Sequence, residues 1–390
     1  MRVIGEHDVR TSAARSNVLV VGSDDLLTPY ARDLVSQLGL RVVSEPVETV
    51  APNAPDHGTA VSRVLLRRSP KWVTPEAVTN LSATAFGRVV MVGCGAVGAA
   101  AGHMIAARAA ARELAFIDLV PGLAASTALD IEHASGITGS DTRCTGGETL
   151  DLLADADVVV VTAGRPRSPG MSRDDLRDIN SKVVRGVAEA VQEHAPDAIL
   201  VIVTNPLDEM TYEAYRSTQL PRERVLGMAG TLDSSRFRWS LATAAGVHPR
   251  DVSAFTLGSH GDEMVPILSH ATIKGRPVAE VLPQDAIDRC VKETVGGGGR
   301  IVAIRRTGSA SIAPAHSIVE MLDAMRGAVS DLLPVSVLLR GEYGIEDVVV
   351  GVPTRLGRAG LEEIVELPLA QEELEALRRA AIIVKERLKN

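Results

Sequence analysis

The chain has 390 residues, 45% of them hydrophobic and 23% charged, and its formal net charge is −8 at pH 7. This length is enough for two or three domains with a large core, and the moderate negative charge excludes the basic surface of a nucleic-acid-binding protein. No apolar run approaches the roughly 20 residues that span a bilayer, and the N-terminus is unlike a secretory signal because it has acidic residues and no apolar stretch before residue 18. We therefore expect a globular protein with neither nucleic acid nor a membrane as partner.

The three cysteines, Cys94, Cys144 and Cys290, lie far apart in the sequence. They show neither the C-x-x-C pairing nor the spacing of metal ligands, and reduced thiols in a cytoplasmic protein explain them most simply. We accordingly predict a cytoplasmic location and no metal site.

Residues 1–86 differ in pattern from the rest and are predicted to be an N-terminal extension, whose role the sequence leaves open. Residues 18–46 are compatible with one strand–helix–strand unit, and residues 62–69 with a third strand. A Pro-rich stretch at 45–58 is predicted to be a loop. Together these features favour a small α/β lobe.

Residues 87–232 alternate short apolar runs with Ala-rich segments. The runs are apolar throughout, which is typical of strands in a buried parallel sheet. They lie at 88–93, 114–118, 156–164 and 198–206. Two of the intervening segments, 98–113 and 173–194, are predicted to be helices, so this part of the chain is expected to be an open α/β sheet of Rossmann type.

The alternation of apolar runs and Ala-rich segments does not continue in residues 233–390. We predict that they form a second, mixed α+β domain. A helix is expected at 234–246, strands and turns at 252–266 and 342–357, and a last helix from Gln371. That last helix carries an apolar stripe at spacings of three and four. The stripe consists of Leu374, Leu377, Ala381, Val384 and Leu388. The glycine run at 295–300 is expected to be a loop or a helix start.

A glycine-rich turn joins the first predicted strand to its helix, with the pattern Gly93-x-Gly95-x-x-Gly98. Such a turn lets a pyrophosphate approach the helix N-terminus, and Asp118, 20 residues beyond Gly98, is placed to bind ribose hydroxyls. An acid there would repel a 2′-phosphate, which favours NAD over NADP. The loop residues expected at the cofactor are Gly93, Gly95, Ala96, Val97 and Gly98. The alternative is an ordinary tight turn with a surface aspartate.

His260 lies among small, turn-forming residues after a predicted strand, where its ring would be accessible for proton transfer. Asp233 and Arg236 are one helical turn apart, so a single helix could present an acid to this histidine and a guanidinium to a substrate carboxylate. The alternative is that Asp233 is a helix N-cap and Arg236 a surface residue.

Six motifs in order resemble the lactate/malate dehydrogenase family, in its lactate-dehydrogenase-like malate dehydrogenase branch. They are GCGAVG, TAGRPRSPGMSRDDL, VTNPLDEMTY, GMAGTLDSSRFR, LGSHGDEMVP and GSASIAPA. The similarity extends over about residues 87–390. It implies an NAD-binding domain at 87–232, a substrate-binding and catalytic domain at 233–390, and a mobile loop that closes over both ligands.

The resemblance assigns roles to the arginines of the segment 162–180. It implies that Arg173 polarises the substrate carbonyl and that Arg167 binds the far end of the substrate. Arg165 has no counterpart in the family, and we expect Arg165 and Arg177 to face solvent. The positions expected to touch the nicotinamide side of the cofactor are Asn180, Val203 and Asn205, and Asn205 is also expected to reach the substrate.

The charge at position 167 bears on which substrate is bound. Arg236 can hold the carboxylate next to the reacting carbon, whereas burying the Arg167 guanidinium is favourable only if a second carboxylate arrives. Ala310 is also small, which leaves room for a longer acid. The expected substrates are therefore malate and oxaloacetate, which would place the enzyme in the tricarboxylic acid cycle.

Two other interpretations stay open: another 2-hydroxy-acid dehydrogenase, such as a lactate enzyme, and a non-catalytic binding or scaffold protein. The resemblance also implies a homodimer or homotetramer. The N-terminal extension leaves that state undecided, because an added lobe could block or rebuild an interface.

Overall fold

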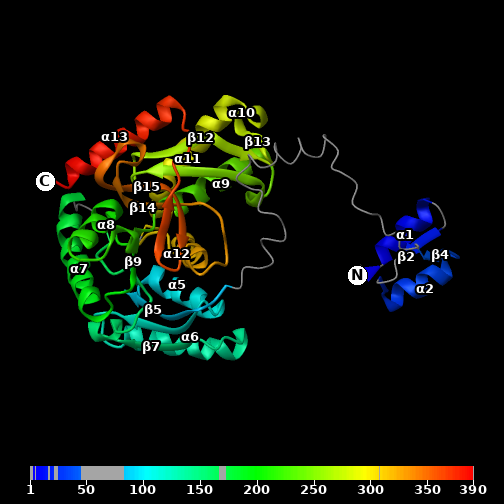
Figure 1. Cartoon of the computed structure of the whole chain (residues 1–390), viewed down its shortest axis with the longest axis horizontal. Helices are drawn as coiled ribbons and strands as arrows, with labels where there is room; N and C mark the ends of the chain where they lie inside the picture. The colour runs from blue at the N-terminus through cyan, green and yellow to red at the C-terminus, as the bar shows by residue number, and fades with distance from the viewer. Residues whose placement is uncertain are drawn as a thin grey trace, which may run out of the picture. The chain divides into compact units, whose positions relative to one another are not determined.

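The computed structural model describes residues 3–4, 6–15, 18–21, 25–44, 83–166, 173–306 and 308–389 (Figure 1). The chain divides into a smaller unit, Met1–Glu76, and a larger unit, Ala77–Asn390. The loop predicted at 45–58 and the strand predicted at 62–69 lie outside the described residues.

In the smaller unit, the described residues form two pairs of parallel strands and two helices. These elements are β1 (Val3–Ile4), α1 (Glu6–Arg15), β2 (Val18–Val21), β3 (Leu26–Leu27), α2 (Pro29–Gln37) and β4 (Arg41–Ser44). β2 pairs with β4 and β1 with β3. α2 connects β3 to β4, and its first turn is capped by Thr28, whose Oγ1 accepts a hydrogen bond from the N–H of Ala31 at 3.2 Å. The strand–helix–strand unit predicted at 18–46 is confirmed.

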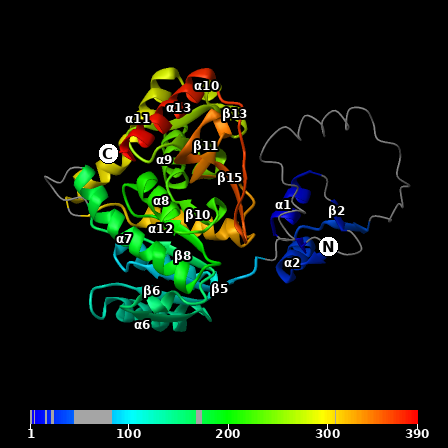
Figure 2. The ribbon, with the colours of Figure 1, turned by 60° about the vertical axis from the view of Figure 1, so that its left-hand side comes forward.

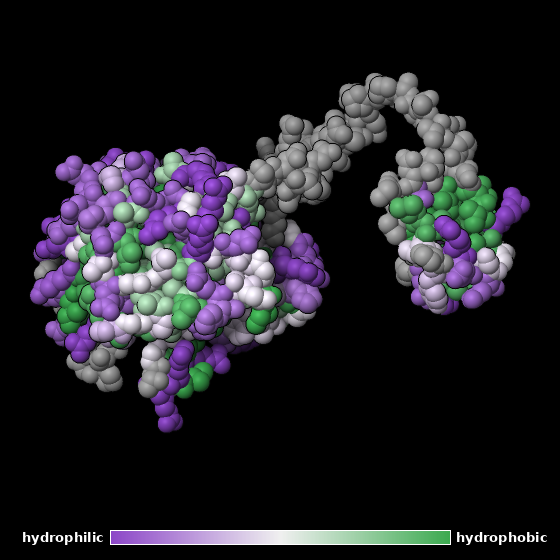
Figure 3. Space-filling view, turned by 90° about the horizontal axis from the view of Figure 1, so that it is seen from below, coloured by the Kyte–Doolittle hydropathy of each residue, from purple (hydrophilic) through white to green (hydrophobic). Residues whose placement is uncertain are grey.

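This unit has a core of its own and also exposes apolar side chains. The core consists of Ile4, Val9, Leu19, Ala31, Leu34, Val35 and Leu40. Large apolar side chains at its surface are Val20, Leu26, Tyr30, Leu38, Val42 and Val43. Figure 3 shows apolar residues gathered on one face of this unit. So small a unit cannot cover all its apolar surface.

The larger unit is organised around six parallel strands in the order β7-β6-β5-β8-β9-β10. Their bounds are β5 (Phe86–Val92), β6 (Ala111–Ile117), β7 (Arg143–Gly147), β8 (Val158–Val161), β9 (Ile199–Ile202) and β10 (Val225–Gly227). Numbered along the chain from β5, this is the order 3-2-1-4-5-6 of a dinucleotide-binding fold. Successive strands are added on one side of β5 up to β7 and on the other side from β8, so the strand order reverses between β5 and β8. The predicted Rossmann-type sheet is confirmed.

Helices cover both faces of this sheet, which is why its strands are apolar throughout. They are α5 (Ala96–Ala107), α6 (Leu123–Thr138), α7 (Arg173–His194) and α8 (Leu207–Arg216). In β5, Val89 and Met91 share a core with α5 and α6, whereas Val90 and Val92 share a core with α7 and α8. The helix predicted at 98–113 was too long: it ends at Ala107, and the chain enters β6 at Ala111.

The rest of the chain extends the same sheet with antiparallel strands in the order β13-β12-β11-β15-β14, where β14 pairs with β10 and β16 with β15. The bounds are α9 (Gly230–Ala245), β11 (Val252–Gly258), β12 (Met264–Ile273), β13 (Arg276–Pro277), α10 (Val278–Val281), α11 (Gln284–Arg305), α12 (Ile312–Met325), β14 (Leu333–Arg340), β15 (Glu346–Gly357), β16 (Gly360–Ile364) and α13 (Gln371–Arg387). Short 3₁₀ turns occur at Leu150–Leu153, Arg222–Arg224, Pro249–Asp251 and Glu342–Gly344. Figure 2 shows the antiparallel strands β11 and β15 beside helices α9, α11 and α13.

The glycine run at 295–300 lies inside α11, so the expectation of a loop or a helix start was wrong. Glycine costs a helix about 1 kcal/mol relative to alanine. On its N-terminal side α11 buries Ala286, Ile287, Cys290 and Thr294. Ala286, Ile287 and Cys290 share a core with α9. Packing of that face outweighs the local propensity.

The last helix agrees with its predicted stripe. In α13, Leu377, Ala381 and Val384 are buried, and Leu374 and Leu388 pack against the same core. Within the described part of the chain, no helix has both the length and the apolarity needed to cross a membrane.

Candidate active site

The turn after β5 brings three chain segments very close together. A Cβ on Gly98 would lie 1.9 Å from the carbonyl oxygen of Gly93, and one on Gly93 would lie 2.6 Å from the backbone nitrogen of Ala163. Gly93 also has a φ of +104°, which disfavours other residues. Gly95, by contrast, caps α5 and faces open space. The N-terminus of α5 therefore has room for an anion.

Asp118 follows β6 directly and lies beside this turn. Its carboxylate accepts hydrogen bonds from the N–H of Cys94 at 2.7 Å and of Val120 at 2.9 Å. These bonds fix the acid at the edge of the sheet where the strand order reverses, which is where a dinucleotide ribose binds in such folds. A glycine turn with open space at the helix N-terminus, and an aspartate held in place beside it, are suited to binding NAD at this edge of the sheet.

The side chain of Asn180, in α7, is buried, and its amide forms hydrogen bonds with backbone groups. Oδ1 accepts the N–H of Arg165 at 2.8 Å, and Nδ2 donates to the carbonyl oxygens of Arg165 at 3.2 Å and of Asn205 at 2.6 Å. Asn180 thus joins the segments that follow β8 and β9. Val203, half-buried, and Asn205, exposed, follow β9.

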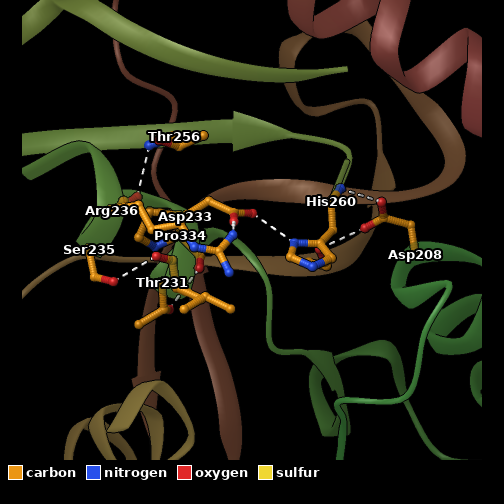
Figure 4. Close-up of polar contacts among 11 residues, drawn as sticks. Asp208, Thr231, Asp233, Ser235, Arg236, Thr256, His260 and Pro334 are labelled. Atoms are coloured by element: carbon orange, nitrogen blue, oxygen red, sulfur yellow. Dashed lines mark hydrogen bonds and ion pairs between the residues drawn. The ribbon is translucent and has the colours of Figure 1, made fainter. Parts of the chain in front are cut away.

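Asp233, in the first turn of α9, contacts the side chains of His260 and Arg236 (Figure 4). Its Oδ2 lies 2.7 Å from Nδ1 of His260, and its Oδ1 accepts a hydrogen bond from a terminal nitrogen of Arg236 at 2.7 Å. The predicted grouping on one helix is present. The alternative role as an N-cap is excluded, because Ala229 is the cap and Asp233 is buried within the helix.

His260 lies in the turn between β11 and β12. Burial by itself lowers the pKa of the imidazole, but the carboxylates of Asp233 and Asp208 outweigh this effect and the opposing charge of Arg236, so the pKa is raised. Because Nδ1 faces Asp233, Nε2 is the ring atom left to exchange a proton with a ligand.

Asp208 was missed by the sequence analysis. It lies in the first turn of α8, where acids are common on exposed surfaces, so nothing in the sequence distinguishes it. In the structure Asp208 is buried, and it accepts the N–H of His260 at 2.8 Å and the hydroxyl of Ser336 at 2.9 Å. Burial raises its pKa. This contact holds the His260 backbone beside the end of β9.

The four arginines of the segment 162–180 differ in whether their side chains are described and in how exposed they are. Arg167 lies outside the described residues, and Arg173 begins α7 with its side chain outside the description. Arg165 is exposed, as predicted. For Arg177 the prediction was wrong: its side chain is 17% exposed and donates to the carbonyl oxygen of Arg387 at 3.0 Å, because the start of α7 meets the end of α13.

In the ranges that the structure describes, no group of three or more His, Cys, Asp or Glu side chains could hold a metal ion. Cys94, Cys144 and Cys290 are buried free thiols, and burial raises the pKa of Cys94 to about 12 and that of Cys144 to about 11. Neither Cys94 nor Cys144 is activated as a nucleophile.

A Rossmann sheet with an anion-accepting turn, together with a histidine–aspartate pair and an adjacent guanidinium, defines an NAD-dependent oxidoreductase. The lactate/malate dehydrogenase NAD-binding domain matches residues 87–227, and the lactate/malate dehydrogenase alpha/beta C-terminal domain matches residues 230–390. The chain belongs to the lactate/malate dehydrogenase family.

Curated relatives share this assignment. A malate dehydrogenase of Pelodictyon phaeoclathratiforme is 44% identical over 303 residues, which are 78% of this chain and 98% of the relative. A malate dehydrogenase of Thermomicrobium roseum is 44% identical over 299 residues, which are 77% of this chain and 96% of the relative.

Solved structures give the same fold. A malate dehydrogenase of Cryptosporidium parvum is 35% identical with a TM-score of 0.75, over 78% of this chain and 98% of that one. A lactate dehydrogenase of the same organism, complexed with lactic acid and the cofactor, is 32% identical with a TM-score of 0.75. The match again covers 78% of this chain and 98% of that one.

Proposed function

We propose that the protein is a malate dehydrogenase that catalyses the reversible, NAD-dependent oxidation of (S)-malate to oxaloacetate. The observation that carries the proposal is the pairing of Asp233 with both His260 and Arg236. The choice of malate is supported by the two curated relatives that are 44% identical, both of which are malate dehydrogenases.

In the proposed reaction, Arg236 binds the carboxylate next to the reacting carbon, and its contact with Asp233 orients the guanidinium. Nε2 of neutral His260 takes the hydroxyl proton of malate, and Asp233 stabilises the imidazolium that forms. Bound NAD supplies the hydride acceptor. In the reverse direction, protonated His260 returns the proton to the ketone oxygen, which Arg173 polarises.

The remaining proposed roles concern the cofactor and the far end of the substrate. Gly93, Gly95, Ala96, Val97 and Gly98 would surround the pyrophosphate, and Asp118 the ribose. Asn180 would act by fixing the backbone around Asn205. Val203 and Asn205 would face the nicotinamide, and Asn205 also the substrate. Arg167 would pair with the second carboxylate, which selects a diacid.

Substitution of Arg167 by Gln tests the choice of substrate. We expect kcat/KM for oxaloacetate to fall about a hundredfold or more, with pyruvate spared or improved, because only the diacid needs a second cation. Arg165→Gln is the matched control, since it removes the same charge from an exposed residue of the same segment. Equal losses for both substrates would contradict the role, and absence of turnover with every 2-hydroxy acid would instead favour a binding protein.

We also propose a homodimer or homotetramer with a cytoplasmic location. The larger unit exposes apolar side chains on α6, α9 and α11, which would be covered by a second copy. They are Leu129, Ile137, Trp239, Ile301, Val302 and Ile304. The reduced state of the three thiols supports the compartment. The domain boundary between residues 232 and 233 is likewise part of this proposal.

A further inference from the structure

Arg387, in the last turn of α13, joins three other elements of the larger unit. Its guanidinium pairs with Oε1 of Glu263 and lies 3.9 Å from Oε1 of Glu209. Its carbonyl oxygen accepts a hydrogen bond from the guanidinium of Arg177 in α7 at 3.0 Å. A residue near the end of the chain therefore connects α7, α8 and the turn that precedes β12.

The two carboxylates that Arg387 binds flank the contact that holds His260. Glu263 lies three residues after His260 in the same turn, and Glu209 directly follows Asp208. Asp208 accepts the backbone N–H of His260 at 2.8 Å. Arg387 thus spans both sides of this hydrogen bond without contacting the ring.

Removing Arg387 would take away the cation that pairs with Glu263. The other oxygen of this carboxylate, Oε2, is buried and accepts no hydrogen bond from any residue that the structure describes. Glu209 and Asp208 are the neighbouring acids, and a buried carboxylate that loses its counter-charge is repelled by acids nearby and moves toward water. The turn that carries His260 is the element free to move, since it is a short connection between two strands.

We propose that Arg387 is a positioning residue for proton transfer: by holding Glu263 against Glu209, it fixes the His260 turn in the place where Asp208 and Asp233 can orient the imidazole. The inference rests on the proposed function, because it assumes that His260 exchanges a proton with the substrate. Arg387 itself touches neither substrate nor cofactor.

The test compares Arg387→Gln with Arg379→Gln. Both substitutions remove one arginine charge from α13, but Arg379 pairs with Glu375 on the helix surface, where both side chains are more than half exposed. We expect Arg387→Gln to lower kcat for oxaloacetate reduction between about tenfold and about a hundredfold, as misplacement of a catalytic group does. Arg387→Lys, which keeps the cation, should recover most of the loss, and Arg379→Gln should match the wild type.

If Arg387→Gln only destabilised the fold, kcat and the affinity for cofactor would fall together. The dissociation constant for NADH is therefore measured in parallel. It should be unchanged in Arg387→Gln, because the glycine turn and Asp118 make no contact with Arg387. Glu263→Gln gives a second route to the same answer. If Arg387 acts through Glu263, the double variant should be no slower than the worse single variant.

Hydrogen exchange separates this inference from the proposed activity. Protection of the His260 backbone amide should fall in Arg387→Gln and be retained in Arg379→Gln, whichever substrate the enzyme uses. Wild-type kcat in Arg387→Gln, or additive losses in the double variant, would overturn the inference. If Arg387→Gln does not fold, wild-type kcat in Glu263→Gln would overturn it. Absence of malate activity in the wild type would overturn the proposed function and leave the exchange test valid.

Discussion

Asp233 interacts with His260 and Arg236 through different oxygens, so one buried carboxylate orients both the proposed proton carrier and the proposed substrate-binding cation. At the residue scale this grouping could be predicted, because a spacing of three places side chains on the same face of a helix. Asp208 could not be predicted, since its contact with His260 joins residues that are 52 positions apart.

The raised pKa of His260 predicts opposite pH dependences for the two directions of reaction. Malate oxidation needs the neutral ring, so its kcat/KM should fall as the pH drops through a value above about 6.5, the ordinary pKa of histidine. Oxaloacetate reduction needs the protonated ring and should fall as the pH rises through the same value.

Asp233→Asn removes the largest contribution that raises the pKa of His260, so the midpoint should move to lower pH. Asp285→Asn, which removes a charge from an exposed residue of α11, is the control. A midpoint that stays in place in Asp233→Asn would show that another group titrates.

At the scale of elements, the glycine run of α11 illustrates where sequence reasoning was insufficient. Helix propensity argues against four consecutive glycines inside a helix, and the packing that overrides it lies in α9, which is distant in sequence. A Cβ on Gly297 would lie 3.1 Å from Cδ of Arg236, whereas Gly296 and Gly299 face open space. The strands of the parallel sheet were easier to predict, because burial on both faces makes each of them apolar throughout.

Alanine at these glycines should separate helix stability from substrate binding. Gly296→Ala, Gly297→Ala and Gly299→Ala should each favour the helix by up to about 1 kcal/mol. Only Gly297→Ala should push the Arg236 side chain aside, raising KM for malate about threefold to tenfold with the NAD dissociation constant unchanged. Steady-state kinetics and thermal melts on the three variants check this. A KM for Gly297→Ala equal to that of Gly296→Ala would show that Arg236 tolerates the methyl group.

At the scale of the whole molecule, every residue assigned to the site lies in the larger unit, and both family matches begin at residue 87 or later. The sequence predicted an extension at residues 1–86, because its pattern breaks the alternation that follows, and the smaller unit of the structure ends at Glu76. The purpose of the smaller unit could not be predicted, since its residues carry no motif of the catalytic family.

Deletion of residues 1–76 should leave kcat/KM for oxaloacetate within about threefold of the full chain, because every residue assigned to the site lies in the larger unit, which has hydrophobic cores of its own. The deletion retains Thr84 and Ala85, which accept hydrogen bonds from Arg358. Light scattering on both proteins gives the number of copies per particle. A larger loss of turnover would show that the smaller unit takes part in the site, and a change in particle mass would show that it takes part in assembly.

One hydrophobic core in the larger unit includes residues from both family domains: Met91 and Phe116 from the first, and Leu322 and Val335 from the second. β10 and β14 also pair across the boundary, at Gly227 and Ser336. We therefore expect the two family domains to melt in one cooperative transition rather than in succession. A dinucleotide that contacts only the first of them should raise the melting temperature of the second by the same amount, since neither is expected to unfold while the other remains native.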